Sequence, residues 1–281
     1  MNTAMVFGGR TGLLGQALCA ALTQAGWQVV PIGRTDVDLW DVDALRALVA
    51  QVQPQVVFNA IAYTAVDRAE DEPQEAWRVN ALFPRLLGQA AGAAHLVHYS
   101  TDYVFDGRAT RPYTPTDPVN PQCVYGRTKL EGETELTRLG LARLTIVRTA
   151  WLFGPGRMNF VARILELARS RPELTIVHDQ VGSPTFTPDL AAASLALVQA
   201  GATGTFHAVN AGQASWCELA AEAVHVAGIA CPVRPITSAE YPQKAARPAY
   251  SVLDTANLTA ATGMTPRSWA LALREYIRAL R

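Results

Sequence analysis

The sequence lacks long apolar runs, and it lacks an excess of charge of either sign. Its apolar stretches stay short of the roughly 18 residues that a transmembrane helix requires, and no basic segment followed by an apolar core stands near the N-terminus. The 24 basic residues balance the 24 acidic ones, and they form no basic blocks. We therefore expect a cytoplasmic protein with neither nucleic-acid nor membrane partners.

Cysteine and histidine are scarce and are not arranged as metal sites. The five histidines fall in strand-like or helical runs, which is typical of structural residues. The four cysteines show no metal-ligand spacing, so we interpret them as reduced thiols; they are Cys19, Cys123, Cys217 and Cys231. The residues alone therefore predict no metal site.

The chain does contain a regular alternation of short apolar runs and amphipathic segments. Such a βαβ rhythm predicts an α/β fold with a doubly wound parallel (Rossmann) sheet. A length of 281 residues and 49% hydrophobic content suffice for this sheet and a smaller second lobe. The predicted strands cover 4–7, 29–33, 56–59, 96–100, 144–148 and 204–209, and the predicted helices cover 16–22, 42–52, 75–91 and 125–139.

The rhythm loosens after Trp151, where a helix over 158–170, a strand over 174–177 and a helix over 189–199 follow. We assign 1–150 to a cofactor-binding domain, to which 174–210 adds further core elements. The smaller, interleaved substrate-binding lobe then comprises 151–173 and 211–281, because no linker separates the two parts.

A glycine loop with the sequence Gly9-Arg-Thr-Gly12-Leu-Leu-Gly15 stands between the first predicted strand and helix. A glycine loop by itself is a weak signal, but a preceding strand and a following helix are the context that pyrophosphate binding requires. Asn59, Ser100 and Trp151 stand at or just beyond strand ends, where the ligands of an open parallel sheet bind.

Tyr125 and Lys129 are four residues apart in a predicted helix and so share one face. An ammonium nearby lowers the pKa of a phenol. To act as a useful acid near neutrality, a phenol needs its pKa lowered by roughly three units from about 10. Such pairs also occur by chance in many helices. Together with the glycine loop and the hydroxyls of Tyr99-Ser-Thr-Asp-Tyr103, however, the pair indicates a nicotinamide-dependent reductase.

Motifs along nearly the whole chain resemble the extended short-chain dehydrogenase/reductases, and more narrowly the dTDP-4-dehydrorhamnose reductases among them. The segment from Ser100 to Gly107 is the most specific, because other extended members usually carry a different serine-rich run there. The other matching segments are the glycine loop, 59–67, 79–81, Asn120-Pro121, 124–129, 148–151, 179–185 and 247–251.

The resemblance implies reduction of the C4 ketone of dTDP-4-dehydro-L-rhamnose to dTDP-L-rhamnose, a donor for surface polysaccharides. Tyr125 would donate the proton, Thr101 would bind the same oxygen, and Lys129 would hold the nicotinamide ribose and acidify Tyr125. Three alternatives stay open: a reductase for another nucleotide-linked 4-keto sugar, an epimerase or dehydratase that keeps its cofactor bound, and a non-catalytic regulatory subunit.

The same resemblance implies substrate contacts from Thr101, Asp102, Tyr103, Trp151 and Arg247. Without it, the segment 102–103 reads as a strand-end turn, Trp151 as core packing and Arg247 as a solvated charge. Arg247 would lie near the diphosphate, which suits the paired donors of a guanidinium.

The choice between NADPH and NADH depends on the residue type at the end of the second predicted strand. Arg34 stands there and favours the extra phosphate of NADPH, with NADH as the alternative. Arg10 either adds phosphate attraction or faces solvent. The implied cofactor-binding residues are Gly9, Thr11, Gly12, Leu13, Leu14, Gly15, Arg34, Asp38, Leu39, Ala62, Tyr63, Thr64, Tyr125 and Lys129.

Two features depart from the family pattern. Some members dimerise through Mg²⁺ held by C-terminal carboxylates, whereas the segment 269–281 offers only Glu275, which makes a poor Mg²⁺ site. We therefore expect a monomer or a weak homodimer, with Mg²⁺ implied only by the resemblance. Tyr250 also stands where asparagine is common.

Overall fold

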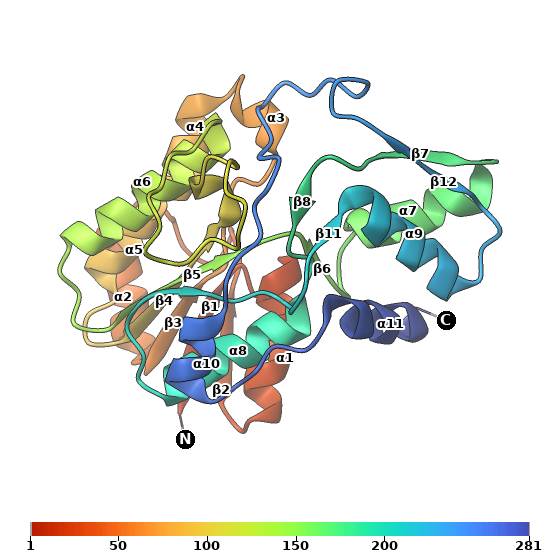
Figure 1. The fold of residues 1–281 in the computed structure, drawn as a ribbon. Helices are drawn as coiled ribbons and strands as arrows, with labels where there is room; N and C mark the ends of the chain where they lie inside the picture. The colour runs from red at the N-terminus through yellow and green to blue at the C-terminus, as the bar shows by residue number, and fades with distance from the viewer. Residues whose placement is uncertain (1, 281) are drawn as a thin grey trace.

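A six-stranded parallel sheet forms the centre of the molecule (Figure 1) in the computed structural model, which describes residues 2–280. The strand order is β10-β5-β4-β3-β1-β2, and every neighbouring pair is parallel. The predicted doubly wound sheet is thereby confirmed. Its strands are β1 (Thr3–Phe7), β2 (Gln28–Ile32), β3 (Val56–Asn59), β4 (His95–Thr101), β5 (Leu144–Thr149) and β10 (Gly204–His207).

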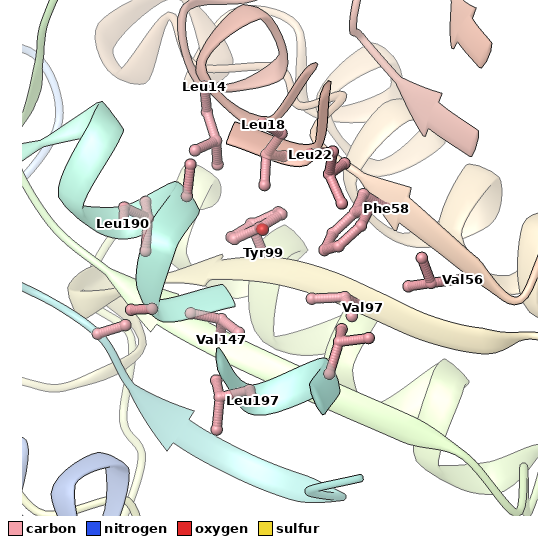
Figure 2. Packing of buried hydrophobic residues seen from close by; sticks show 14 of the residues in the cluster. Leu14, Leu18, Leu22, Val56, Phe58, Val97, Tyr99, Val147, Leu190 and Leu197 are labelled. Carbon is pink, nitrogen blue, oxygen red and sulfur yellow. The ribbon is translucent and has the colours of Figure 1, made fainter. Parts of the chain in front are cut away.

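Helices cover both faces of this sheet, which explains why most residues of its strands are buried. One face packs against α1 (Leu13–Gln24), α8 (Thr187–Gln199) and α10 (Ala256–Thr262). Figure 2 shows Leu14, Leu18 and Leu22 of α1 pointing toward Phe58 and Tyr99 of the sheet. The other face packs against α2 (Val42–Val52), α5 (Phe83–Ala90) and α6 (Val124–Arg138).

A second lobe lies beside the carboxyl edge of the sheet (Figure 1). It contains α7 (Phe160–Ser170), α9 (Trp216–Ala227), α11 (Trp269–Ala279) and a parallel pair, β7 (Leu174–Val177) with β12 (Val233–Ile236). Of the segment 174–210, α8 and β10 accompany the large sheet, whereas β7 lies outside it. The proposed domain boundaries stay a prediction. Two short pairs complete the strands: β6 (Leu152–Phe153) with β9 (Thr185–Phe186), and β8 (Val181–Gly182) with β11 (Ala214–Ser215).

The segment predicted as one helix over 75–91 consists of three elements. After α3 (Val66–Ala69), α4 (Pro73–Trp77) leads into a π-helical turn, η1 (Arg78–Leu82), and then into α5. The turn places the buried Asn80 so that its amide bonds Tyr63 and Thr128. Gly132 of α6 packs on the Asn80 carbonyl, where any Cβ would collide. A π-turn at such a close approach is typical of functional regions.

None of the helices within residues 2–280 combines the length and the apolar character that crossing a membrane demands. The same residues contain no cluster of three or more His, Cys, Asp or Glu side chains that could hold a metal ion. Glu275, the carboxylate considered for Mg²⁺, instead forms an ion pair with Arg267 at 2.5 Å.

His207 ends β10 and is fully buried, so the fold should lose stability in acid. Burial, reinforced by the charge of Arg148, lowers the pKa of His207 to about 3 from 6.5. The unfolded chain therefore binds the extra proton first, and stability falls as pH drops from 6.5 toward 3. We expect this histidine to contribute about 2 kcal/mol of the loss between pH 6.5 and 5. Urea titrations should show a shallower pH slope for His207→Gln, whereas His225→Gln on the exposed side of α9 should keep the wild-type slope.

Candidate functional site

Thr101, Tyr125 and Lys129 come together at the carboxyl end of β4. Tyr125 lies in the first turn of α6, and Lys129 follows one turn later on the same face, as its spacing predicts. The Lys129 Nζ donates a 2.5 Å hydrogen bond to the carbonyl of Tyr99. The Tyr125 ring meets the Tyr103 ring edge-on with centroids 5.5 Å apart. A phenol, a hydroxyl and an ammonium therefore share one edge of the sheet.

Burial is the largest influence on the acidity of Tyr125 and Lys129. The packing around the partly exposed Tyr125 raises the pKa of its phenol, and a hydrogen bond with Thr101 only partly opposes this. Burial lowers the pKa of Lys129 to about 8, although the carboxylate of Glu133 acts in the opposite direction. The Lys129 ammonium is directed to a backbone carbonyl, and the expected acidification of Tyr125 by Lys129 stays a prediction. At pH 7 both groups keep their protons.

Asp102 lies directly beneath the Thr101 hydroxyl and is 2% exposed. It begins the short helix η2 (Asp102–Val104). Thr101 Oγ1 donates to Asp102 Oδ1 at 3.0 Å, and Ser251 Oγ donates to Oδ2 at 2.6 Å. Burial raises the pKa of Asp102 to about 6, against the effect of these two hydrogen bonds. The carboxylate thus fixes the orientation of Thr101, whereas its predicted contact with substrate stays a prediction.

Trp151 follows β5 in a conformation that is rare for a residue with a side chain, with φ at 48°. Its indole stacks on Trp216 at 3.5 Å between centroids and 5° between planes, and Gly182 packs against the same indole. Such a conformation costs on the order of 1–3 kcal/mol and is concentrated at functional sites. One face of Trp151 is therefore taken by Trp216, which restricts any sugar contact to the remainder of the ring.

Arg247 reaches the site from the far end of the chain. Its Nη2 donates to Asp67 Oδ2 at 2.8 Å, and its Nη1 donates to the Tyr103 hydroxyl at 3.3 Å. The Arg247 side chain is 13% exposed, so it is not the solvated loop charge that composition alone suggests. Tyr103 in turn contacts Tyr125. The structure thus links the predicted substrate residues Tyr103 and Arg247 to the proton-donor candidate.

The glycine loop fits a dinucleotide pyrophosphate. Gly12 precedes α1, whose uncharged first turn leaves the positive end of the helix dipole uncompensated. A Cβ on Gly15 would collide with the carbonyl of Gly8, so close packing of helix on strand requires glycine there. Gly8 itself, with φ at 85°, approaches the backbone of Ala60 after β3. The strand order changes direction between β1 and β3, which is where this fold binds nucleotides.

Beside this loop, Arg10 is not free in solvent. Its Nε and Nη2 bond Asp36 at 2.5 and 2.8 Å, and Asp36 also accepts from the backbone N–H of Gly33. Arg34 is exposed at the same strand end. The Arg10–Asp36 pair and Arg34 thus stand just after β2, the strand end where the adenosine ribose of a dinucleotide is expected.

The other predicted cofactor residues differ in what their side chains contact. Leu14 and Leu39 are buried in the two core clusters, so only their backbones are available to a ligand. The Tyr63 hydroxyl donates to Glu72 at 2.6 Å and accepts from Arg68. Asp38 accepts from the N–H of Trp40. The remaining positions follow β1 or β3 in the chain, and their cofactor contacts stay predictions; they are Gly9, Thr11, Leu13, Ala62 and Thr64.

Comparison with known proteins decides the family. Residues 2–281 match the family described as the RmlD substrate binding domain. The chain belongs to this RmlD family. A dTDP-4-dehydrorhamnose reductase from Streptomyces griseus is 43% identical over 281 residues, which cover 97% of this chain and 92% of the relative.

Solved structures agree with this membership in the RmlD family. The crystal structure of a dTDP-4-dehydrorhamnose reductase from Clostridium acetobutylicum has a TM-score of 0.95 and 41% identity, and it covers 99% of both chains. A Bacillus anthracis dTDP-4-dehydrorhamnose reductase in complex with NADP also has a TM-score of 0.95, with 31% identity over 99% of this chain and 100% of that one.

From the sequence alone, no role was predicted for three residues of this RmlD-family site, namely Asp67, Ser251 and Trp216. Asp67 and Ser251 stand within recognised motifs, but their partners Arg247 and Asp102 are 180 and 149 residues away. Trp216 opens α9 behind the capping box of Ser215 and Glu218. The pattern Ser-x-x-Glu before an apolar run was a signal for this helix start, but nothing in it pointed to stacking on Trp151.

Proposed function

We propose that this chain reduces the C4 ketone of dTDP-4-dehydro-L-rhamnose to dTDP-L-rhamnose with NADPH, and so serves surface polysaccharide biosynthesis. The observation that carries the proposal is the convergence of Thr101, Tyr125 and Lys129 beside a dinucleotide loop. Membership in the RmlD family and similarity to named reductases over nearly the full chain support the same substrate.

The site residues suit the charge that develops during ketone reduction. Tyr125 keeps its proton at pH 7 and donates it to the carbonyl oxygen as negative charge forms there. Thr101 donates its single hydroxyl proton to Asp102 in this structure and would turn it toward the same oxygen to supply a hydrogen bond there. Lys129, still largely charged at pH 7, binds the ribose of the cofactor and keeps positive charge near the phenol.

A reduced nicotinamide supplies the hydride when it is bound. The glycine loop and the uncharged start of α1 would hold its pyrophosphate. Arg10 and Arg34 would attract the phosphate that distinguishes NADPH from NADH. Asp102, Tyr103, Trp151 and Arg247 are proposed to contact the nucleotide sugar.

Absorbance at the reduced-nicotinamide band tests this function directly. Enzymatically prepared dTDP-4-dehydrorhamnose is offered with NADPH and then with NADH, and we expect consumption of reduced cofactor in step with formation of dTDP-L-rhamnose. Purified protein that retains NAD and consumes no NADPH would instead be an epimerase or dehydratase. A stoichiometric enzyme partner together with no turnover would indicate the regulatory subunit.

Arg34 should decide the preference between the two cofactors. Arg34→Gln is expected to lower kcat/KM with NADPH roughly tenfold, because one charge-assisted contact to the extra phosphate is lost. The value with NADH should change by less than about twofold, because NADH has no phosphate there. Initial rates with each cofactor give the ratio, and Arg46→Gln on the exposed face of α2 serves as the control. An unchanged NADPH/NADH ratio would remove Arg34 from the cofactor site.

A further inference from the structure

A strap formed by residues 244–254 joins the two lobes across the site. Figure 1 shows the chain leaving β12, passing over to α3 and then descending beside β8. The later part of the strap is fixed by backbone hydrogen bonds, since Val181 N–H donates to Ala249 and Tyr113 N–H donates to Val252. Pro248 packs tightly on Gly107. The side chain of Arg247 therefore leaves from an anchored backbone.

Asp67 of α3 holds the beginning of the strap with both oxygens. Oδ1 accepts the N–H of Ala245 at 3.0 Å, and Oδ2 accepts Nη2 of Arg247 at 2.8 Å. A second ion pair, between Lys244 and Asp71, joins the same two segments nearby. Both partners of that pair are about half exposed; Asp67 is 45% exposed as well, but its partner Arg247 is only 13% exposed.

Asp67 holds one nitrogen of the Arg247 guanidinium and thereby directs the other nitrogen toward the site. With Nη2 held by Asp67, Nη1 points to the hydroxyl of Tyr103 at 3.3 Å. The guanidinium also lies 5.9 Å from the Tyr103 ring centroid, and that ring meets Tyr125 edge-on. A guanidinium has a long and flexible stem, so a fixed carboxylate greatly restricts where its donors point.

We propose that Asp67 is a positioning residue for substrate binding: it orients Arg247 over Tyr103 so that the remaining guanidinium donors face the nucleotide diphosphate. The inference rests on the proposed function for the identity of that ligand. Asp67 does not touch the reacting atoms: Thr101 is held by Asp102, Lys129 is held by the carbonyl of Tyr99, and Tyr125 is connected to Arg247 only through the ring of Tyr103. Its loss should therefore affect KM far more than kcat.

Asp67→Asn tests this role, because the amide keeps an acceptor for Ala245 and removes the charge that holds Arg247. We expect KM for dTDP-4-dehydrorhamnose and Kd for dTDP to rise roughly tenfold, the effect of losing one charge-assisted hydrogen bond. We expect kcat to change by less than about threefold. Asp71→Asn removes the neighbouring ion pair of the same strap and should leave all three constants within about twofold of wild type.

A double-mutant cycle distinguishes two explanations for an effect of Asp67→Asn: loss of the orientation of Arg247, or a general loosening of the strap. In an Arg247→Ala background, Asp67→Asn should have no further effect on Kd for dTDP, because the residue it orients is gone. Additive effects, or equal effects of Asp67→Asn and Asp71→Asn, would overturn the inference. Calorimetry measures the Kd for dTDP and needs no turnover. It therefore decides the role of Asp67 even if the absorbance assay shows that the proposed function is wrong. Wild-type protein that does not bind dTDP would overturn the inference as well.

Discussion

Tyr125→Phe is expected to lower kcat by about 10²–10⁴-fold, the contribution of a well-placed general acid. The phenol shares a hydrogen bond with the Thr101 hydroxyl and lies on the same helix face as Lys129. The phenol is protonated throughout the neutral range and can donate without first gaining a proton. Single-turnover measurements with NADPH and the keto sugar would report the loss in the chemical step.

Cofactor binding should survive this substitution, because phenylalanine keeps the ring that packs against Tyr103. Fluorescence titration with NADPH should therefore give a Kd within about threefold of wild type. Tyr241→Phe, which removes an exposed hydroxyl, is the matched control and should retain full turnover. Near-wild-type turnover of Tyr125→Phe would refute the assignment of Tyr125 as proton donor, whichever nucleotide sugar is the substrate.

The strands of the sheet were predictable because burial on both faces favours short, mainly apolar runs. The predicted strand 56–59 matches β3, and the predicted helix 42–52 matches α2 at both ends, where Asp41 caps the first turn. The pairing of Tyr125 with Lys129 was predictable for the same local reason, since helix geometry alone places them on one face. Local periodicity was therefore enough to predict helices and strands, and to predict which residues of one helix share a face.

Contacts between distant segments were not predictable in this way. No local pattern specifies that Asp67 meets Arg247 or that Trp216 stacks on Trp151. The π-turn at 78–82 was missed because it keeps nearly helical spacing and differs only where Asn80 is drawn toward Tyr63. The effect of burial on the pKa of Tyr125 was not predictable either, because spacing gives the distance to a charge, whereas burial depends on the complete fold.

Glu133→Gln is expected to destabilise the fold by about 3–5 kcal/mol, because it leaves Arg148 as an uncompensated buried charge. Glu133 of α6 and Arg148 of β5 form a bidentate pair at 2.9 and 2.7 Å, with side chains only 7% and 6% exposed. The same carboxylate raises the pKa of Lys129 against the effect of burial. Its removal should lower the pKa of Lys129 below about 8, so the alkaline limb of the kcat/KM profile should move to lower pH.

Urea unfolding at pH 7 measures the stability change, and Glu166→Gln provides the control, because its pair with Arg163 is exposed on both sides and should be worth less than about 0.5 kcal/mol. The double variant Glu133→Leu with Arg148→Met removes both charges and should recover most of the lost stability, since replacing a buried pair by apolar residues is often neutral. If the double variant were as unstable as Glu133→Gln, lost packing rather than an unpaired charge would be the cause. The pH profile tests the effect on Lys129 separately, because an alkaline limb that stays in place would mean that Glu133 does not control its protonation.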